Sequence, residues 1–134
     1  MFSFHRILRV MSVLLAAGLI PACNGSLGQN GNNSPPPSFG GATATPAATV
    51  GDVNLAWSPA TDFSGTGITY NIWYAQGTVS GSETYQFSTP ASVSPSGIQV
   101  AGLVSGKTYI FHVQAQDGTG AVDSNTAEPT ATVP

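Results

Sequence analysis

The sequence contains few charged side chains and almost no basic ones. Charged residues make up 7% of its 134 positions, where about 25% is typical of soluble proteins. Its only basic residues are Arg6, Arg9 and Lys107, and all six acidic residues lie beyond residue 51. Residues 23–134 contain one lysine and no arginine. They cannot neutralise a row of phosphates, which excludes nucleic acid as a partner. Electrostatic attraction to anionic lipid headgroups is excluded for the same reason.

Cysteine and long apolar segments are also scarce. Cys23 is the only cysteine, so the chain can form no internal disulfide and no cysteine-rich zinc site. The apolar run at residues 10–20 is interrupted by Ser12 and Gly18, and it is shorter than the roughly 18 to 20 residues that span a bilayer. Arginines precede this run and small residues follow it, which is typical of an export signal that is removed.

The window LIPAC, residues 19–23, resembles the lipobox of bacterial lipoproteins. Ile20 is an aliphatic residue three positions before the cysteine, and Ala22 is a small residue directly before it. The resemblance implies that residues 1–22 are a lipoprotein signal peptide and that Cys23 becomes the first mature residue. Cys23 would then carry a diacylglycerol and an N-linked acyl chain such as palmitate. Two or more acyl chains anchor a protein stably where one does not.

This resemblance also implies a location. The protein would be bound to a membrane through its lipid, extracytoplasmic, in a bacterial cell envelope, and Asn24 favours the outer over the inner membrane in a Gram-negative cell. Three alternatives stay open: a plain signal peptide cut near Ala22, an uncleaved membrane anchor, and a buried structural cysteine.

Residues 23–36 form the lipidated cysteine and a tether rich in Gly, Asn and Pro. Residues 24–36 contain one apolar side chain, Leu27, and no charge, so they bury too little surface to offset the entropy of ordering. A Gly-rich chain of this length reaches about 20 Å. Pro35, Pro36 and Pro37 stiffen its junction with a single folded domain at residues 37–134.

From residue 38 onward, apolar side chains alternate with period two, the pattern of half-buried strands. Tyr85 and Phe87 alternate in this way in one of the less regular segments. No segment has helical periodicity. The sequence predicts an all-β sandwich of about seven short strands. The predicted strands lie within residues 39–45, 52–59, 68–75, 84–88, 97–103, 108–116 and 127–134.

Several of these segments resemble a fibronectin type III domain. The family has a tryptophan at the end of its strand B, matched by Trp57, and a leucine six positions before a tyrosine, matched by Leu103 and Tyr109. Gly106 falls in the turn between them, although Ser105 replaces the usual proline. The resemblance covers residues 37–134 and implies an immunoglobulin-like sandwich. It also implies a tyrosine corner, in which the Tyr109 hydroxyl bonds the backbone before it.

Candidates for chemistry are few. A catalytic triad would have to use His112, which alternation places on an outer strand face, and no nucleophile or phosphate-loop motif is present, so no enzyme is expected. In the family fold Asp62, Asp117 and Asp123 lie at one end of the sandwich and are candidate calcium ligands. Aspartates also form turns by bonding their own backbone. That interpretation is favoured, and no metal or other cofactor is expected.

A candidate binding face lies on neighbouring strands. Alternation places Trp73 away from the core, and Ile110, His112 and Gln114 are expected to face outward beside it. An exposed tryptophan with polar neighbours can stack on a sugar ring or anchor a protein interface. The sequence therefore favours a non-catalytic binding or spacer module for an envelope protein or polysaccharide. The alternatives are a structural docking subunit of an envelope complex and a carbohydrate-binding accessory protein of a secreted hydrolase.

Overall fold

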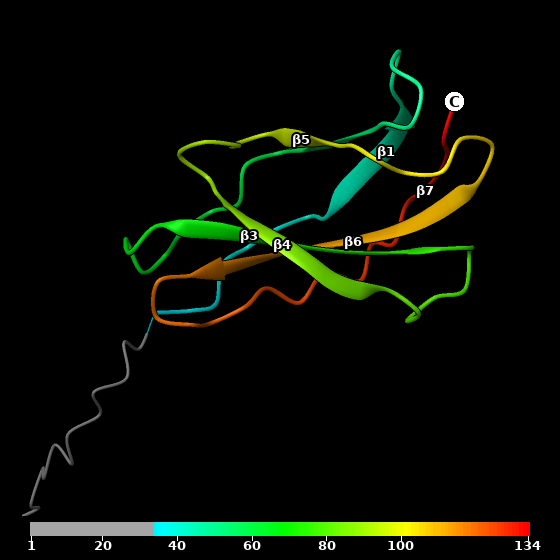
Figure 1. The fold of residues 1–134 in the computed structure, drawn as a ribbon. Helices are drawn as coiled ribbons and strands as arrows, with labels where there is room; N and C mark the ends of the chain where they lie inside the picture. Colours follow the sequence, from blue (N-terminus) through cyan, green and yellow to red (C-terminus); the bar gives the residue numbers. More distant parts are fainter. Residues whose placement is uncertain (1–33) are drawn as a thin grey trace, which may run out of the picture. The chain divides into compact units, whose positions relative to one another are not determined.

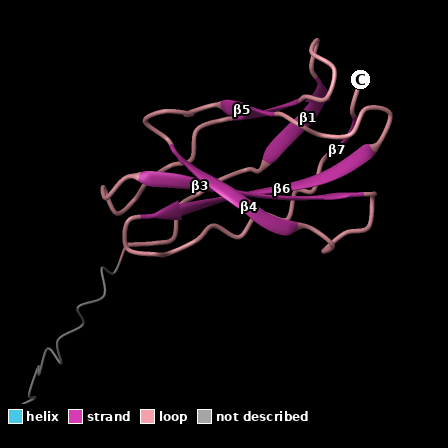
Figure 2. Ribbon diagram, in the orientation of Figure 1, coloured by secondary structure: helices cyan, strands magenta, loops and turns pink. Residues whose placement is uncertain are grey.

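The computed structural model describes residues 34–134. The predicted signal peptide, Cys23 and most of the tether lie outside the described residues. Within residues 34–134 no helix is long and apolar enough to cross a membrane. The described part of the chain contains seven strands, joined by loops and turns (Figures 1 and 2). They are β1 (Ala42–Pro46), β2 (Val53–Trp57), β3 (Ile68–Gln76), β4 (Thr84–Pro90), β5 (Gly97–Val100), β6 (Thr108–Asp117) and β7 (Thr130–Thr132).

The strands form a sandwich of two sheets, as the sequence predicted, and every pair of neighbouring strands is antiparallel. One sheet has the order β1-β2-β5 and the other has the order β4-β3-β6-β7. Figure 1 shows β1 and β5 in one layer and β3, β4 and β6 in the other. The longest strands, β3 and β6, pair from Ile68 with Asp117 to Gln76 with Tyr109. This pair is the centre of the four-stranded sheet and carries side chains on both of its faces.

The core lies between the sheets and follows the predicted alternation. The burial pattern of β2 is strictly alternating, with Val53, Leu55 and Trp57 buried. The Trp57 and Tyr70 rings lie 4.8 Å apart between centroids, and Phe39 lies 5.3 Å from Tyr70. These tilted aromatic contacts connect residues before β1, at the end of β2 and within β3, and so hold the two sheets together.

Two tyrosine hydroxyls accept hydrogen bonds from backbone amides outside the strands. The Tyr109 hydroxyl accepts from the Val104 N–H at 3.2 Å, which confirms the predicted tyrosine corner. The Tyr70 hydroxyl accepts from the Ala60 N–H at 2.8 Å, although Tyr70 is 0% exposed. The second bond was not predicted, because alternation indicates only that Tyr70 faces inward. It fixes the connection between β2 and β3 against the core.

A β-bulge changes the predicted faces of β4. Ile72 pairs with Phe87 but the next residue, Trp73, pairs with Tyr85, so the register shifts between them. Phe87 packs against the core, whereas Tyr85 is 55% exposed on the outer face. The prediction that Tyr85 and Phe87 alternate on one face was therefore wrong. The extra residue of a bulge moves the side chains beyond it to the opposite face of the strand.

Candidate binding site

Three aromatic side chains form a row across the outer face of the four-stranded sheet. Trp73 lies on β3 and pairs with His112 on β6 and with Tyr85 on β4. The centroids of the Trp73 and Tyr85 rings are 5.5 Å apart at 70°, and those of Trp73 and His112 are 5.8 Å apart at 53°. Trp73 is half-buried because a ring packs on each side of it. The predicted outward facing of Trp73 and His112 is confirmed.

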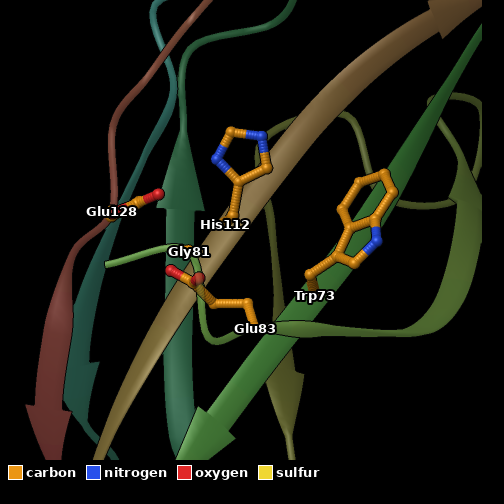
Figure 3. A pocket seen from close by; sticks show the side chains of 5 residues that line it. All are labelled: Trp73, Gly81, Glu83, His112 and Glu128. Atoms are coloured by element: carbon orange, nitrogen blue, oxygen red, sulfur yellow. The ribbon is translucent and has the colours of Figure 1, made fainter. Parts of the chain in front are cut away.

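The row borders a cavity of about 200 Å³. Its lining residues are Trp73, Gly81, Glu83, His112 and Glu128. Figure 3 shows Glu128, His112 and Trp73 in that order across the view, which follows the strand order β7-β6-β3. Glu83 enters from the end of the connection between β3 and β4. The cavity therefore combines one large aromatic wall with two carboxyl groups and an imidazole.

The connection between β3 and β4 crosses the outer face of β6. Ser80 lies in this connection, and its hydroxyl donates to the carboxylate of Glu128 just before β7. Because β6 lies between β3 and β7 in the sheet, this hydrogen bond holds the connection over β6. It also fixes Glu128 at the cavity.

Two polar atoms at the cavity are shielded from solvent and have no hydrogen-bond partner among the described residues. They are Oε1 of Glu83 and Nδ1 of His112. A buried polar group without a partner loses the free energy of its hydration and is therefore uncommon in folded proteins. Both atoms lie on side chains that line the cavity, so rotation of either side chain toward a ligand there would give its unpartnered atom a hydrogen-bond partner.

The structure corrects one member of the predicted binding face. Ile110 was expected to be exposed beside Trp73, but it is only 3% exposed. It lies two residues before His112 on the same face of β6, and it pairs with Ala75 and Thr130. The connection held by the Ser80–Glu128 bond crosses this part of the strand. Gln114 is half-buried and pairs with Asn71, next to the Trp73–His112 pair, but it does not line the cavity.

The predicted calcium ligands form hydrogen bonds within their own loops. Asp62 accepts from the Ser64 hydroxyl at 2.7 Å, and its two oxygens also accept from the amides of Ser64, Gly65 and Gly67 at 2.8–3.0 Å. The Ser64 hydroxyl, with these amides, lowers the pKa of Asp62 below its ordinary value because they stabilise the ionised form. Desolvation opposes this effect without reversing it.

Asp117 and Asp123 have the same role in the hairpin that follows β6. Asp117 accepts from the Thr119 hydroxyl at 2.6 Å and from the Ala121 amide at 3.0 Å, and the Thr119 hydroxyl is the largest cause that lowers its pKa. Asp123 accepts from the amides of Ala115 and Asn125. Residues 34–134 contain no group of three or more side chains placed to hold a metal ion. Most of the hydrogen bonds that these carboxylates accept come from their own loops, as the turn interpretation predicts, although the Ala115 amide belongs to β6.

The two acidic loops nevertheless lie together, as the family resemblance implied. The Gly118 amide donates to the Thr66 hydroxyl at 2.8 Å, and the Ser64 hydroxyl contributes to lowering the pKa of Asp117 as well as that of Asp62. A Cβ at Gly118 would lie 2.8 Å from that of Thr66. This contact requires glycine at position 118.

Glu83 and Glu128 were not among the predicted site residues. Both lie outside the regular alternation, one before β4 and one before β7. The available signal was charge: they are the only two glutamates in the chain. Only the pairing of β7 with β6 and the crossing of the β3–β4 connection bring them to the same cavity.

Seven strands in a three-stranded and a four-stranded antiparallel sheet, with a tyrosine corner before β6, define an immunoglobulin-like β-sandwich. The family model described as Fibronectin type III domain matches residues 35–132, and the chain belongs to this family. Domains of this family are typically non-catalytic modules. No curated protein sequence matches the chain.

Solved structures with the same fold come from bacterial and human proteins. An Fn3-like protein from Clostridium thermocellum is 20% identical with a TM-score of 0.55, over 77% of this chain and 96% of that one. The third fibronectin III domain of human KIAA0343 protein is 17% identical with a TM-score of 0.61, over 83% and 92%. The fn3 domain of human collagen alpha-1(XX) chain is 23% identical with a TM-score of 0.52, over 80% and 94%. These similarities support the fold alone.

Proposed function

We propose that this protein is a lipid-anchored cell-envelope protein whose single fibronectin type III domain is a non-catalytic binding module for protein or polysaccharide. The observation that carries this proposal is the open cavity on the outer sheet face, lined by the half-buried side chains of Trp73, His112, Glu83 and Glu128. An aromatic wall beside hydrogen-bonding groups is the usual composition of a small recognition site. In a spacer without a ligand, this face would have no binding role.

The absence of catalysis in the proposal is supported by the surroundings of His112. A histidine that acts as a general base needs a nucleophile within hydrogen-bond reach and a group that orients its second nitrogen. Within residues 34–134, Nδ1 of His112 has no hydrogen-bond partner that could orient the imidazole. The ring packs against Trp73 instead. These contacts suit a binding surface better than a triad.

The anchor in the proposal rests on the sequence alone. LIPAC ends at the single cysteine, Cys23, and a charge-free tether follows. A covalent diacylglycerol and an N-linked acyl chain on Cys23 would hold the domain near the membrane despite its acidic character. We place it in the cell envelope, at the outer membrane in a Gram-negative cell.

The first experiment is intact mass spectrometry of the protein purified from membranes of its own host, beside the Cys23→Ala variant. The expected mass lacks residues 1–22 and includes two or three acyl chains, and the variant carries no acyl mass. An unmodified Cys23 thiol in the membrane-purified protein would overturn the anchor. That result would leave the binding role of the folded domain to be judged by itself.

A second candidate function, a carbohydrate-binding accessory protein, is favoured by the aromatic row of Trp73 and Tyr85. Rings on one face can stack on sugar rings. This function predicts retention on polysaccharide that is lost in Trp73→Ala. A docking subunit of an envelope complex predicts instead a co-purifying protein and no effect of added sugars.

A further inference from the structure

The cavity over β6 has an excess of negative charge. Two of its five lining residues are glutamates, and no lysine or arginine lines it. The single basic residue of the described chain, Lys107, lies in the turn before β6. Carboxylates in a partly buried space are stabilised by an opposite charge. A cationic ligand would therefore be favoured there over an anionic or neutral one.

The unpartnered atoms of the cavity match the donors of a primary ammonium group. Oε1 of Glu83 is an acceptor, and Nδ1 of His112 is an acceptor in the tautomer that is protonated at Nε2. One oxygen of Glu128, Oε2, is held by the Ser80 hydroxyl, so its other oxygen remains for a ligand. An ammonium group has three N–H donors and no acceptor. Its three donors match these three acceptors in kind and number.

Trp73 supplies the remaining wall. A cation near an indole face is attracted by the ring quadrupole, and tryptophan is the best of the aromatic side chains in this respect. The methylene stem of a lysine can also lie along an apolar ring while its head is bound. A neutral sugar would stack on the same ring but would leave both carboxylates without a compensating charge.

We propose that the cavity formed by Trp73, Glu83, His112 and Glu128 binds a primary ammonium group, presented as a lysine side chain by a partner protein. This inference rests on the proposed binding role and specifies its ligand. Lysine suits the site better than arginine because its charge is compact and its three donors diverge from one atom. The aromatic wall contacts the stem of the lysine, and the carboxylates and imidazole contact its nitrogen.

The test uses the full chain in detergent micelles and titrates it with Nα-acetyl-lysine amide. The signals of the Trp73 indole N–H and the His112 ring are followed by NMR. The Trp73 indole is assigned with Trp73→Phe, because Trp57 is the only other tryptophan. Nα-acetyl-norleucine amide is the matched neutral ligand. A saturable shift of both signals with the lysine compound, and none with the norleucine compound, is expected.

Variants assign the charge requirement to the cavity. Glu83→Gln and Glu128→Gln are each expected to raise the Kd for the lysine compound about tenfold, since each replaces a carboxylate acceptor with a neutral amide oxygen and so loses the charge assistance of that hydrogen bond. Asp52→Asn is the control, because Asp52 accepts from Gln99 on the other sheet, and its Kd should be unchanged. If one glutamate variant fails to fold, the other variant and the norleucine comparison still decide.

Three results would overturn the proposal: equal responses to the lysine and norleucine compounds, no saturable response to the lysine compound, or wild-type Kd values in both glutamate variants. Saturable binding of glucose or N-acetylglucosamine without binding of the lysine compound would also overturn it, and would favour the carbohydrate function. Loss of the lipid does not affect this assay. Failure of the anchor and failure of the site are therefore distinguishable.

Discussion

The hydrogen bond from the Ala60 amide to Tyr70 allows a precise test of how the fold is stabilised. Tyr70→Phe removes one hydroxyl and keeps the ring, which packs against Trp57 and Phe39. The hydroxyl is fully buried and accepts from the Ala60 N–H at 2.8 Å. After the substitution that amide has no acceptor in the structure. The variant therefore isolates one hydrogen bond that connects the core to the β2–β3 connection.

The magnitude follows from the burial of both partners. A net hydrogen bond contributes about 0.5–1.5 kcal/mol, and leaving a buried donor without a partner costs about 1–3 kcal/mol. Ala60 is only partly buried, so water recovers some of this cost. We expect the free energy of unfolding to fall by about 2 kcal/mol. For a domain of this size, that loss lowers the Tm by roughly 8–16 °C.

The measurement is urea and thermal unfolding of the full chain, followed by circular dichroism. Tyr85→Phe is the matched control: Tyr85 is 55% exposed and its hydroxyl bonds only the Ser88 hydroxyl, so its loss should be below about 0.5 kcal/mol. Tyr109→Phe should fall between the two, because its bond to Val104 is longer at 3.2 Å. A Tyr70→Phe variant as stable as Tyr85→Phe would refute the reasoning.

Three further predictions concern packing and charge. Gly97→Ala should lower the Tm by more than 5 °C, which corresponds to a loss of roughly 1 kcal/mol or more in the free energy of unfolding. The reason is that a Cβ at position 97 would lie 2.4 Å from the Leu55 carbonyl oxygen. Gly40→Ala is the control and should leave the Tm unchanged, because no atom lies within 4 Å of a Cβ at position 40. Ile110→Ala should cost about 2–4 kcal/mol in urea unfolding, whereas Val104→Ala, 53% exposed, should cost little; equal effects would show that Ile110 is not buried. Thr119→Ala should raise the pKa of Asp117 in a carboxyl NMR titration, because it removes the largest cause that lowers it. A carboxyl group whose pKa is lowered by folding stabilises the protein at a pH above its ordinary value of about 3.9, and this stabilisation is lost as the pH falls through the folded pKa. The variant should therefore also unfold at a higher pH on acidification. An unchanged Asp117 titration would contradict this assignment.

The sequence alone was sufficient for the fold class, because its signals are local. Alternation with period two indicated the strands and the inward faces of β2 and β6. The resemblance of Leu103, Gly106 and Tyr109 to the fibronectin type III pattern implied the tyrosine corner. The resemblance of LIPAC to a lipobox likewise depends on a few adjacent residues, and lipidation of Cys23 stays a prediction.

Tertiary structure decided the composition of the candidate site. Alternation identified Trp73 and His112, since adjacent strands place their outer side chains side by side. It failed for Tyr85 because one bulge reverses a face, and for Ile110 because a segment thirty residues earlier covers it. Glu83 and Glu128 are 45 positions apart and meet only through the strand order β3-β6-β7 and the Ser80–Glu128 bond. Such contacts depend on which strands pair and how a connection crosses them, and no local pattern in the sequence records that.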